Sequence, residues 1–342
     1  MEFSRYTRRT LITVSLLFAF ILAALVLRQV VTVLLLLFAG ILLAVLLGGL
    51  TTKLCEQTSL PRGWGLSLVL VLLVAFVVGA GGVAGPRVDD QVAELGKRIP
   101  SAIEEIRASL SQYSWGRSLM ASSPNSKQTF SVVAGGLTNA VGAITSAVVV
   151  LVTGLYLAVA PSTYIDGALR LVPAGRRERG HEIVRVVGRA LRWWLVGRVA
   201  SMGVVGALTA AGLWISGIPL AFALGLIAAL LSFVPYIGPI VSTIPAALVA
   251  LADSPSKVFY VFIVYAAVQF LESNLITPLI QKRTVSIPPA VLIGAQTVMG
   301  VLVGAIGVFI ATPLAVVCIV LIQMIYIEDV LGETITPLGA RE

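Results

Sequence analysis

The chain has 342 residues, of which 58% are apolar and only 12% are charged, and its mean hydropathy is +1.00. A soluble domain of this size carries about 25% charged residues, so the composition excludes an ordinary soluble protein and predicts an all-α polytopic membrane protein. The net charge of +8 does not indicate a nucleic-acid partner, because the cations lie between apolar runs and not among exposed aromatic residues.

The N-terminal part, residues 1–86, predicts three transmembrane helices. A span needs about 20 apolar residues. The apolar runs that meet this requirement are Leu11–Leu27, Val30–Leu50 and Gly65–Ala84, the first two separated by a turn of only Arg28 and Gln29. The first run could also belong to a signal peptide, but it is too long for one and another span follows at once, so we expect a retained helix with a cytoplasmic N-terminus.

The middle of the chain predicts two polar connections around a fourth span. Residues 87–130 are expected outside the cytoplasm as a helical insert, because their apolar residues recur at helical spacing. The fourth span is expected in residues 131–163. Residues 164–198 form a strongly basic amphipathic connection, which the positive-inside rule places in the cytoplasm. Its helix either lies along the membrane surface, with Trp193 and Trp194 as anchors, or packs on protein.

The C-terminal part, residues 199–327 with a tail of 328–342, is expected to be the transport core. Its segment Leu220–Ala252 would be about 50 Å long as a straight helix, against a hydrocarbon core of about 30 Å. The residues that interrupt it are Pro235, Tyr236, Gly238 and Pro239. We expect a re-entrant hairpin, since a fold-back also places Lys282 and Arg283 in the cytoplasm; the alternative is one strongly tilted crossing.

The last apolar run, Thr284–Ile327, is interrupted in a similar way. It opens at Pro288-Pro289 and is expected to break again at Pro313, with Gly304 and Gly307 between. Two interrupted segments around one helix are typical of transporter binding sites. The glycines also fit close helix packing, Gly300 and Gly304 having GxxxG spacing.

The helix between the two interrupted segments, Val258–Ile280, carries a single acid. Tyr265, Gln269 and Glu272 fall on one face, so this face is polar. An acid inside a span usually faces a polar cavity. Glu272 is therefore expected near the middle of the helix as a transport residue, or as a structural acid that binds free backbone groups of the hairpin.

Few residues are available for other chemistry. His181 is the only histidine, and Cys55 and Cys318 have no metal-ligand or disulfide spacing. No phosphate-binding glycine loop occurs. The sequence predicts no enzyme, no metal and no cofactor.

The tract from Leu195 to Pro313 resembles the autoinducer-2 exporter-like (AI-2E) family of bacterial permeases. The residues that carry the resemblance are Gly197, Gly206, Thr209, Gly212-Leu213, Gly217-Ile218-Pro219, Gly225, Phe233-Val234-Pro235-Tyr236-Ile237-Gly238-Pro239, Gln269, Glu272, Leu275, Pro278, Val285, Pro289, Gly300, Gly304, Gly307 and Pro313. Two positions depart from the family. Pro288 stands where many relatives have His, which weakens any proton relay, and Arg198 stands where Gln is common.

The resemblance implies an inner-membrane transporter, multi-pass and homo-oligomeric, with about seven or eight spans and two broken hairpins. Members are associated with export of the signalling molecule autoinducer-2, and others with sodium/proton exchange. We expect a secondary transporter or facilitator for a small polar solute, with a cation/proton antiporter and a non-transporting membrane scaffold as alternatives. The expected site or gate residues are Glu272, Gln269, Tyr265, Pro235, Tyr236, Gly238, Pro239, Pro278, Pro289, Gly304, Gly307 and Pro313.

Overall fold

The computed structural model describes residues 5–75, 90, 91, 93–96, 98, 99, 104, 111, 140–276, 278 and 287–333, and within them every regular element is helical. This confirms the all-α class. Four helices in the described part are long and apolar enough to cross a membrane: Gln29–Thr58, Ala174–Ile215, Pro255–Leu275 and Ala305–Glu328. A fifth candidate is the pair Thr145–Val159 and Pro161–Leu169, bent by 88°. The total of seven or eight spans stays a prediction.

The first helix differs from the prediction. Helix α1 (Arg5–Thr58) is continuous over 54 residues, so the predicted turn at Arg28 and Gln29 is wrong. Arginine and glutamine are good helix formers, and neither glycine nor proline accompanies them, so nothing there stops the helix. At 1.5 Å per residue α1 is about 80 Å long, far more than one crossing needs. A short helix, Arg62–Ala75, follows it.

Helix α5 (Ala140–Val159) packs along α1 through small residues. A Cβ on Gly154 would lie 3.0 Å from the carbonyl oxygen of Gly40, which is tighter than most Cβ contacts, so glycine favours this approach. Helix α6 (Pro161–Leu169) then turns away from α5 by 88°.

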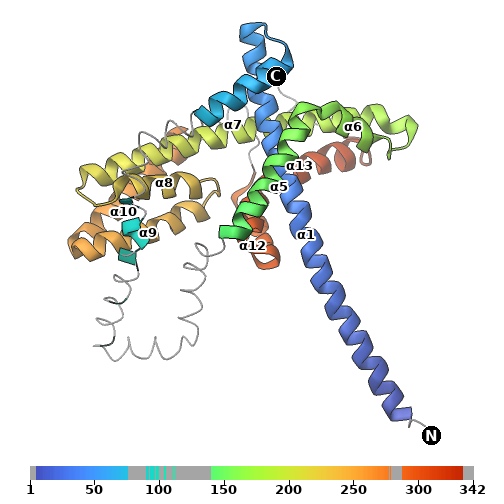
Figure 1. Ribbon diagram of the computed structural model, residues 1–342, viewed down its shortest axis with the longest axis horizontal. Helices are drawn as coiled ribbons and strands as arrows, with labels where there is room; N and C mark the ends of the chain where they lie inside the picture. Colours follow the sequence, from blue (N-terminus) through green and yellow to red (C-terminus); the bar gives the residue numbers. More distant parts are fainter. Residues whose placement is uncertain are drawn as a thin grey trace.

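The basic connection and the fifth predicted span form one helix. After the short helix η1 (Ala174–Arg176), helix α7 (Arg177–Ile215) runs for 39 residues, about 58 Å. Leu191 and Trp194 are buried in one cluster with Leu42 of α1. This part of α7 therefore packs on protein, the second of the two alternatives. In Figure 1, α8, α9 and α10 lie against one end of α7, and α6 lies at the other end, with α1 crossing between.

The first interrupted segment folds back as a pair of short helices. Helix α8 (Ala221–Leu231) and helix α9 (Ile237–Asp253) pack together antiparallel, and one buried cluster contains Leu224 of α8 and Val249 of α9. They are about 16 and 25 Å long, so neither alone reaches across about 30 Å of hydrocarbon. Helix α10 (Pro255–Leu271) follows and ends in a π-helical turn, η2 (Glu272–Ile276).

Part of the predicted insert packs at the open end of this pair. Most of residues 87–130 lie outside the described residues, but 90, 91, 93–96, 98 and 99 are helical. Leu95 belongs to the α8–α9 cluster, and the N–H of Ala223 donates to Oε1 of Gln91 at 3.1 Å. The insert therefore contacts the end of the pair opposite the break.

The second interrupted segment consists of helix α12 (Pro289–Val303), helix α13 (Ala305–Leu321) and the π-helical η3 (Ile322–Glu328). The predicted break at Pro313 is wrong, because α13 continues through this proline. The break lies at Gly304, whose φ of 79° and ψ of −150° are open essentially to glycine alone. Gly307 then packs so close to α12 that a Cβ would overlap the carbonyl of Met299.

Candidate functional site

The hairpin tip, residues 232–236 between α8 and α9, contains one of the three non-glycine residues with a positive φ in the described backbone. Tyr236 has φ 64° and ψ −54°, and the N–H of Ile237 donates to the Pro235 carbonyl at 2.7 Å. This is the geometry of a γ-turn with a positive φ, which is rare and costs energy for any residue with a Cβ. Gly238 lies so close to α8 that a Cβ would overlap the Leu231 carbonyl. Pro235 and Gly238 thus permit a chain reversal that most sequences would resist.

An aromatic side chain anchors the tip on two sides. The Phe233 ring meets Trp194 of α7 edge-on and stacks on Phe309 of α13, with ring centroids 5.6 Å apart in both pairs. Each such pair contributes about 0.5–1.5 kcal/mol beyond its buried area. The tip is therefore fixed between a helix of the basic connection and a helix of the second interrupted segment.

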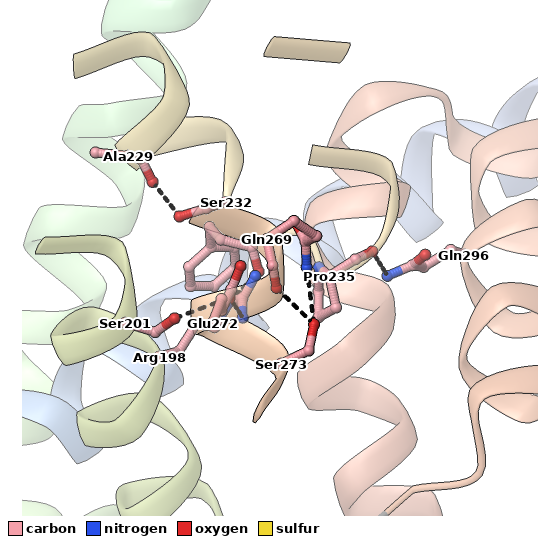
Figure 2. A network of polar contacts seen from close by, with 10 residues as sticks. Arg198, Ser201, Ala229, Ser232, Pro235, Gln269, Glu272, Ser273 and Gln296 are labelled. Carbon is pink, nitrogen blue, oxygen red and sulfur yellow. Dashed lines mark hydrogen bonds and ion pairs between the residues drawn. The ribbon is translucent and has the colours of Figure 1, made fainter. Parts of the chain in front are cut away.

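A buried ion pair lies beside the tip (Figure 2). Nη1 of Arg198, on α7, donates to Oε1 of Glu272 at 3.2 Å, and Ser201 Oγ donates to the same oxygen at 2.9 Å. The side chains of Arg198 and Glu272 are only 12% and 6% exposed. Arg198 also donates through Nε to the Phe233 carbonyl at 3.1 Å. One guanidinium thus joins the acid of α10 to the tip.

A buried amide contacts the tip from the other side (Figure 2). Nε2 of Gln296, on α12, donates to the Pro235 carbonyl at 3.1 Å. It also donates to Thr312 Oγ1, on α13, at 3.4 Å. Gln296 is fully buried. We call the tip together with Arg198, Ser201, Glu272, Gln296 and Thr312 the polar junction.

The ion pair of the junction is buried, so it contributes little net stability. Two charges removed from water lose hydration that their mutual attraction barely replaces, so a buried ion pair is a poor source of stability. Ionisable residues inside membrane segments are rare, and they usually pair with one another or face a polar cavity. Glu272 also opens a π-helical turn, an irregularity that is frequent at functional sites.

Three predicted site residues surround a different feature. Pro239, Tyr265 and Gln269 line an apolar groove of about 650 Å³ between α9 and α10. The Tyr265 hydroxyl donates to the Ser242 carbonyl at 3.0 Å. Nε2 of Gln269 donates to Oγ of Ser273, one turn further along the chain, at 3.4 Å. The three residues predicted on one polar face of this helix thus face two different places. Tyr265 and Gln269 line the groove, and Glu272 lies in the polar junction.

The remaining predicted residues are spread over both interrupted segments. Pro235, Tyr236 and Gly238 form or adjoin the tip, as the sequence predicts. Pro289 opens α12, Gly304 makes the α12–α13 break, Gly307 packs α13 on α12, and Pro313 is buried within α13. Pro278 is exposed, and the residues on either side of it lie outside the described part.

Sequence reasoning missed four members of the junction: Arg198, Ser201, Gln296 and Thr312. Arg198 was assigned to the basic connection, although its place at the start of a 54-residue uncharged tract was a signal. Gln296 is the one amide in the otherwise apolar run Pro289–Val303, which is a second signal. Ser201 and Thr312 carry no such signal, since small hydroxyl residues are common in membrane helices. Among the described residues, no group of three His, Cys, Asp or Glu side chains is placed to hold a metal ion.

Comparison with known proteins gives a consistent result. Residues 14–327 match the model of a family described as "AI-2E family transporter". The chain is 27% identical over 276 residues to the Bacillus subtilis protein named "Putative transport protein YueF", covering 75% of each chain. It is 32% identical over 143 residues to "Putative transport protein YrrI" of the same organism, covering 42% of this chain and 40% of that one.

Proposed function

Because the chain belongs to the AI-2E family of transporters, we propose that it moves a small polar solute across a membrane and that the polar junction is where this solute is bound and gated. The family membership supports the general class, a membrane transporter or permease. The solute, its direction and the roles of individual residues belong to the proposal. Autoinducer-2 is the first candidate solute, because the family takes its name from it.

The observation that carries the proposal is the contact of Arg198 with both Glu272 and the tip. A hydroxyl or carbonyl of a solute can replace either partner of this guanidinium. If the solute draws Arg198 away from the Phe233 carbonyl, the tip loses one of its two polar anchors. Binding and movement of the tip are then one event, which is what a gated transporter requires.

The proposed placement in the membrane rests on the insert 87–130 and the α8–α9 pair. We place the protein in the bacterial inner membrane, with the N-terminus in the cytoplasm and the insert 87–130 outside. The contact of the insert with Ala223 supports a tip that enters from outside, because both ends of the α8–α9 pair would then lie on the outer side. A homo-oligomer is part of this proposal.

The test is uptake into proteoliposomes by the wild type and by Glu272→Gln. The Gln side chain keeps the shape and one acceptor but loses the charge, so we expect uptake to fall about tenfold or more, the value of a charge-assisted hydrogen bond. Autoinducer-2 is the first probe. Asn274→Ala is the control, since Asn274 is exposed and, within the described part of the chain, hydrogen-bonds the Phe270 carbonyl one turn earlier.

An antiporter is the second candidate, favoured by the burial of Glu272 beside a single cation. Protonation of this carboxylate would leave Arg198 free for another partner. The same vesicles with a sodium gradient and an internal pH dye distinguish the two. Proton movement that requires sodium and disappears in Glu272→Gln would favour exchange. No flux of autoinducer-2, sodium or protons by the wild type would favour a scaffold and contradict the proposal.

A further inference from the structure

Gln296 joins the two interrupted segments by hydrogen bonds, beside the ring contact of Phe233 with Phe309. It extends from α12, and its Nε2 contacts the Pro235 carbonyl of the tip and Thr312 of α13. Among the described residues, no other side chain donates hydrogen bonds both to the tip and to the α12–α13 pair. Its position therefore depends on both segments at once.

The acceptor that Gln296 holds belongs to the strained turn. The Pro235 carbonyl already accepts the N–H of Ile237 at 2.7 Å within the γ-turn at Tyr236. With Gln296, both lone pairs of this oxygen are used. A strained backbone conformation persists only where its surroundings determine it more than once. The amide of Gln296 supplies such a restraint from outside the turn.

Gln296 is itself held in place. Thr312, its second partner, is buried in α13. The two helices approach closely because Gly307 lets α13 pack on the Met299 carbonyl of α12. A shift of α13 along α12 would therefore move the amide away from Pro235.

The amide is not explained by stability. Its Oε1 is buried and has no hydrogen-bond partner among the described residues. An unsatisfied buried acceptor costs free energy, so an apolar side chain of the same shape would serve packing better. The hydrogen bonds that Nε2 donates are therefore the reason that we infer for a glutamine at this position.

We propose that Gln296 is a positioning residue that couples the α12–α13 pair to the hairpin tip and holds the tip in the conformation seen here. The inference rests on the proposed function in treating the tip as the gate. When α13 moves relative to α12, the hydrogen bond to Pro235 breaks, the turn at Tyr236 relaxes, and the tip becomes free to open.

The test measures opening of the tip without any solute. Val234 lies in the tip and is 3% exposed, so Val234→Cys, in a chain with Cys55→Ser and Cys318→Ser, reacts with a water-soluble maleimide only when the tip opens. Adding Gln296→Met removes both hydrogen bonds at nearly constant shape. We expect labelling to become about three- to tenfold faster, the equilibrium value of one hydrogen bond.

Two further variants separate coupling from packing. Thr312→Val keeps the volume of the side chain and frees only the second contact of the amide, so it should accelerate labelling less than Gln296→Met, and the two changes together should be less than additive. Thr297→Val is the control. Thr297 is the next residue of α12, is exposed, and among the described residues hydrogen-bonds the Ile293 carbonyl of its own helix.

A pH readout adds a result that a purely structural role would not give. In Gln296→Glu an ionised carboxylate cannot donate to Pro235, whereas a protonated one can. The labelling rate, divided by that of the parent with Gln296, should exceed one at about pH 8 and fall toward one at about pH 5. Glu272 and Arg198, the charged groups on the other side of the tip, are present in both proteins and cancel in this ratio.

The proposal is overturned if Gln296→Met and Thr312→Val leave the labelling rate unchanged, or if Thr297→Val raises it equally. A pH-independent ratio for Gln296→Glu also overturns it. These outcomes are distinguishable from failure of the proposed function, because labelling requires no transported solute. Unchanged labelling together with solute flux would support the proposed transporter function and would show that Gln296 does not control the gate.

Discussion

The α8–α9 break and the α12–α13 break both interrupt an apolar helical segment, but they do so with different residues. The second is made by Gly304, which adopts its backbone angles without a Cβ and has open space where one would stand. The first places Tyr236, a residue with a Cβ, at a positive φ and holds it with side chains from α7, α12 and α13. A turn that glycine makes cheaply needs no polar partners. Under the proposed function, the strained turn with buried polar partners is the one that changes conformation.

The largest expected effect comes from breaking the ion pair. In Glu272→Ala, Arg198 stays buried without its partner, which should destabilise the protein by about 3–5 kcal/mol. The double variant Arg198→Met with Glu272→Leu should recover much of this loss, since apolar replacements of such pairs are often neutral. Thermal unfolding in detergent measures both. A double variant no more stable than Glu272→Ala would contradict the account.

The second prediction compares glycines of the two breaks. Gly238→Ala places a Cβ against the Leu231 carbonyl and should cost about 1–3 kcal/mol or more, with loss of transport. Gly304→Ala meets no atoms but keeps a glycine-only backbone, so it should cost about 1–3 kcal/mol and leave the junction intact.

Gly294→Ala provides the control for both. This glycine lies within α12 with open space around it, so alanine should be neutral or stabilising by up to about 1 kcal/mol. Equal loss of transport in Gly304→Ala and Gly238→Ala would remove the distinction between the two breaks.

A smaller effect is expected at the ring contact between the segments. Phe309→Leu keeps an apolar side chain but removes the stacking on Phe233 at 5.6 Å, so it should cost about 0.5–1.5 kcal/mol. The measurement is a double-mutant cycle with Phe233→Leu on unfolding stability. Additive losses would show that the two rings do not stabilise each other.

The smallest effect is expected outside the junction. Tyr265→Phe loses the hydrogen bond to the Ser242 carbonyl, worth about 0.5–1.5 kcal/mol, and should leave transport unchanged. A transport defect without loss of stability would instead show that the α9–α10 groove takes part in transport.

The sequence predicts the interrupted segments well because length, proline and glycine are local signals. Leu220–Ala252 is too long for one crossing and breaks at Pro235–Gly238, where the structure reverses the chain. Local signals fail where a continuous helix and an interrupted one are similar in free energy. Pro313 continues a helix because buried neighbours hold it, and Arg28-Gln29 lies within α1 because polar residues alone do not stop a helix.

The junction is harder to predict than the fold. Glu272 is conspicuous as a lone acid, but its partner Arg198 lies 74 positions away on another helix. The same holds for Gln296, which is 61 positions from the carbonyl it contacts. Such pairs arise from packing between helices, and periodicity within one helix carries no information about them.

The most direct test of the account compares initial uptake rates in proteoliposomes for wild type, Glu272→Gln and Gly304→Ala. The probe is autoinducer-2 or sodium, whichever the wild type carries, and the proteins are matched for amount. If the polar junction carries transport, Glu272→Gln should be slower by about tenfold or more, whereas Gly304→Ala should stay within about threefold of wild type. Wild-type uptake by Glu272→Gln would contradict the account.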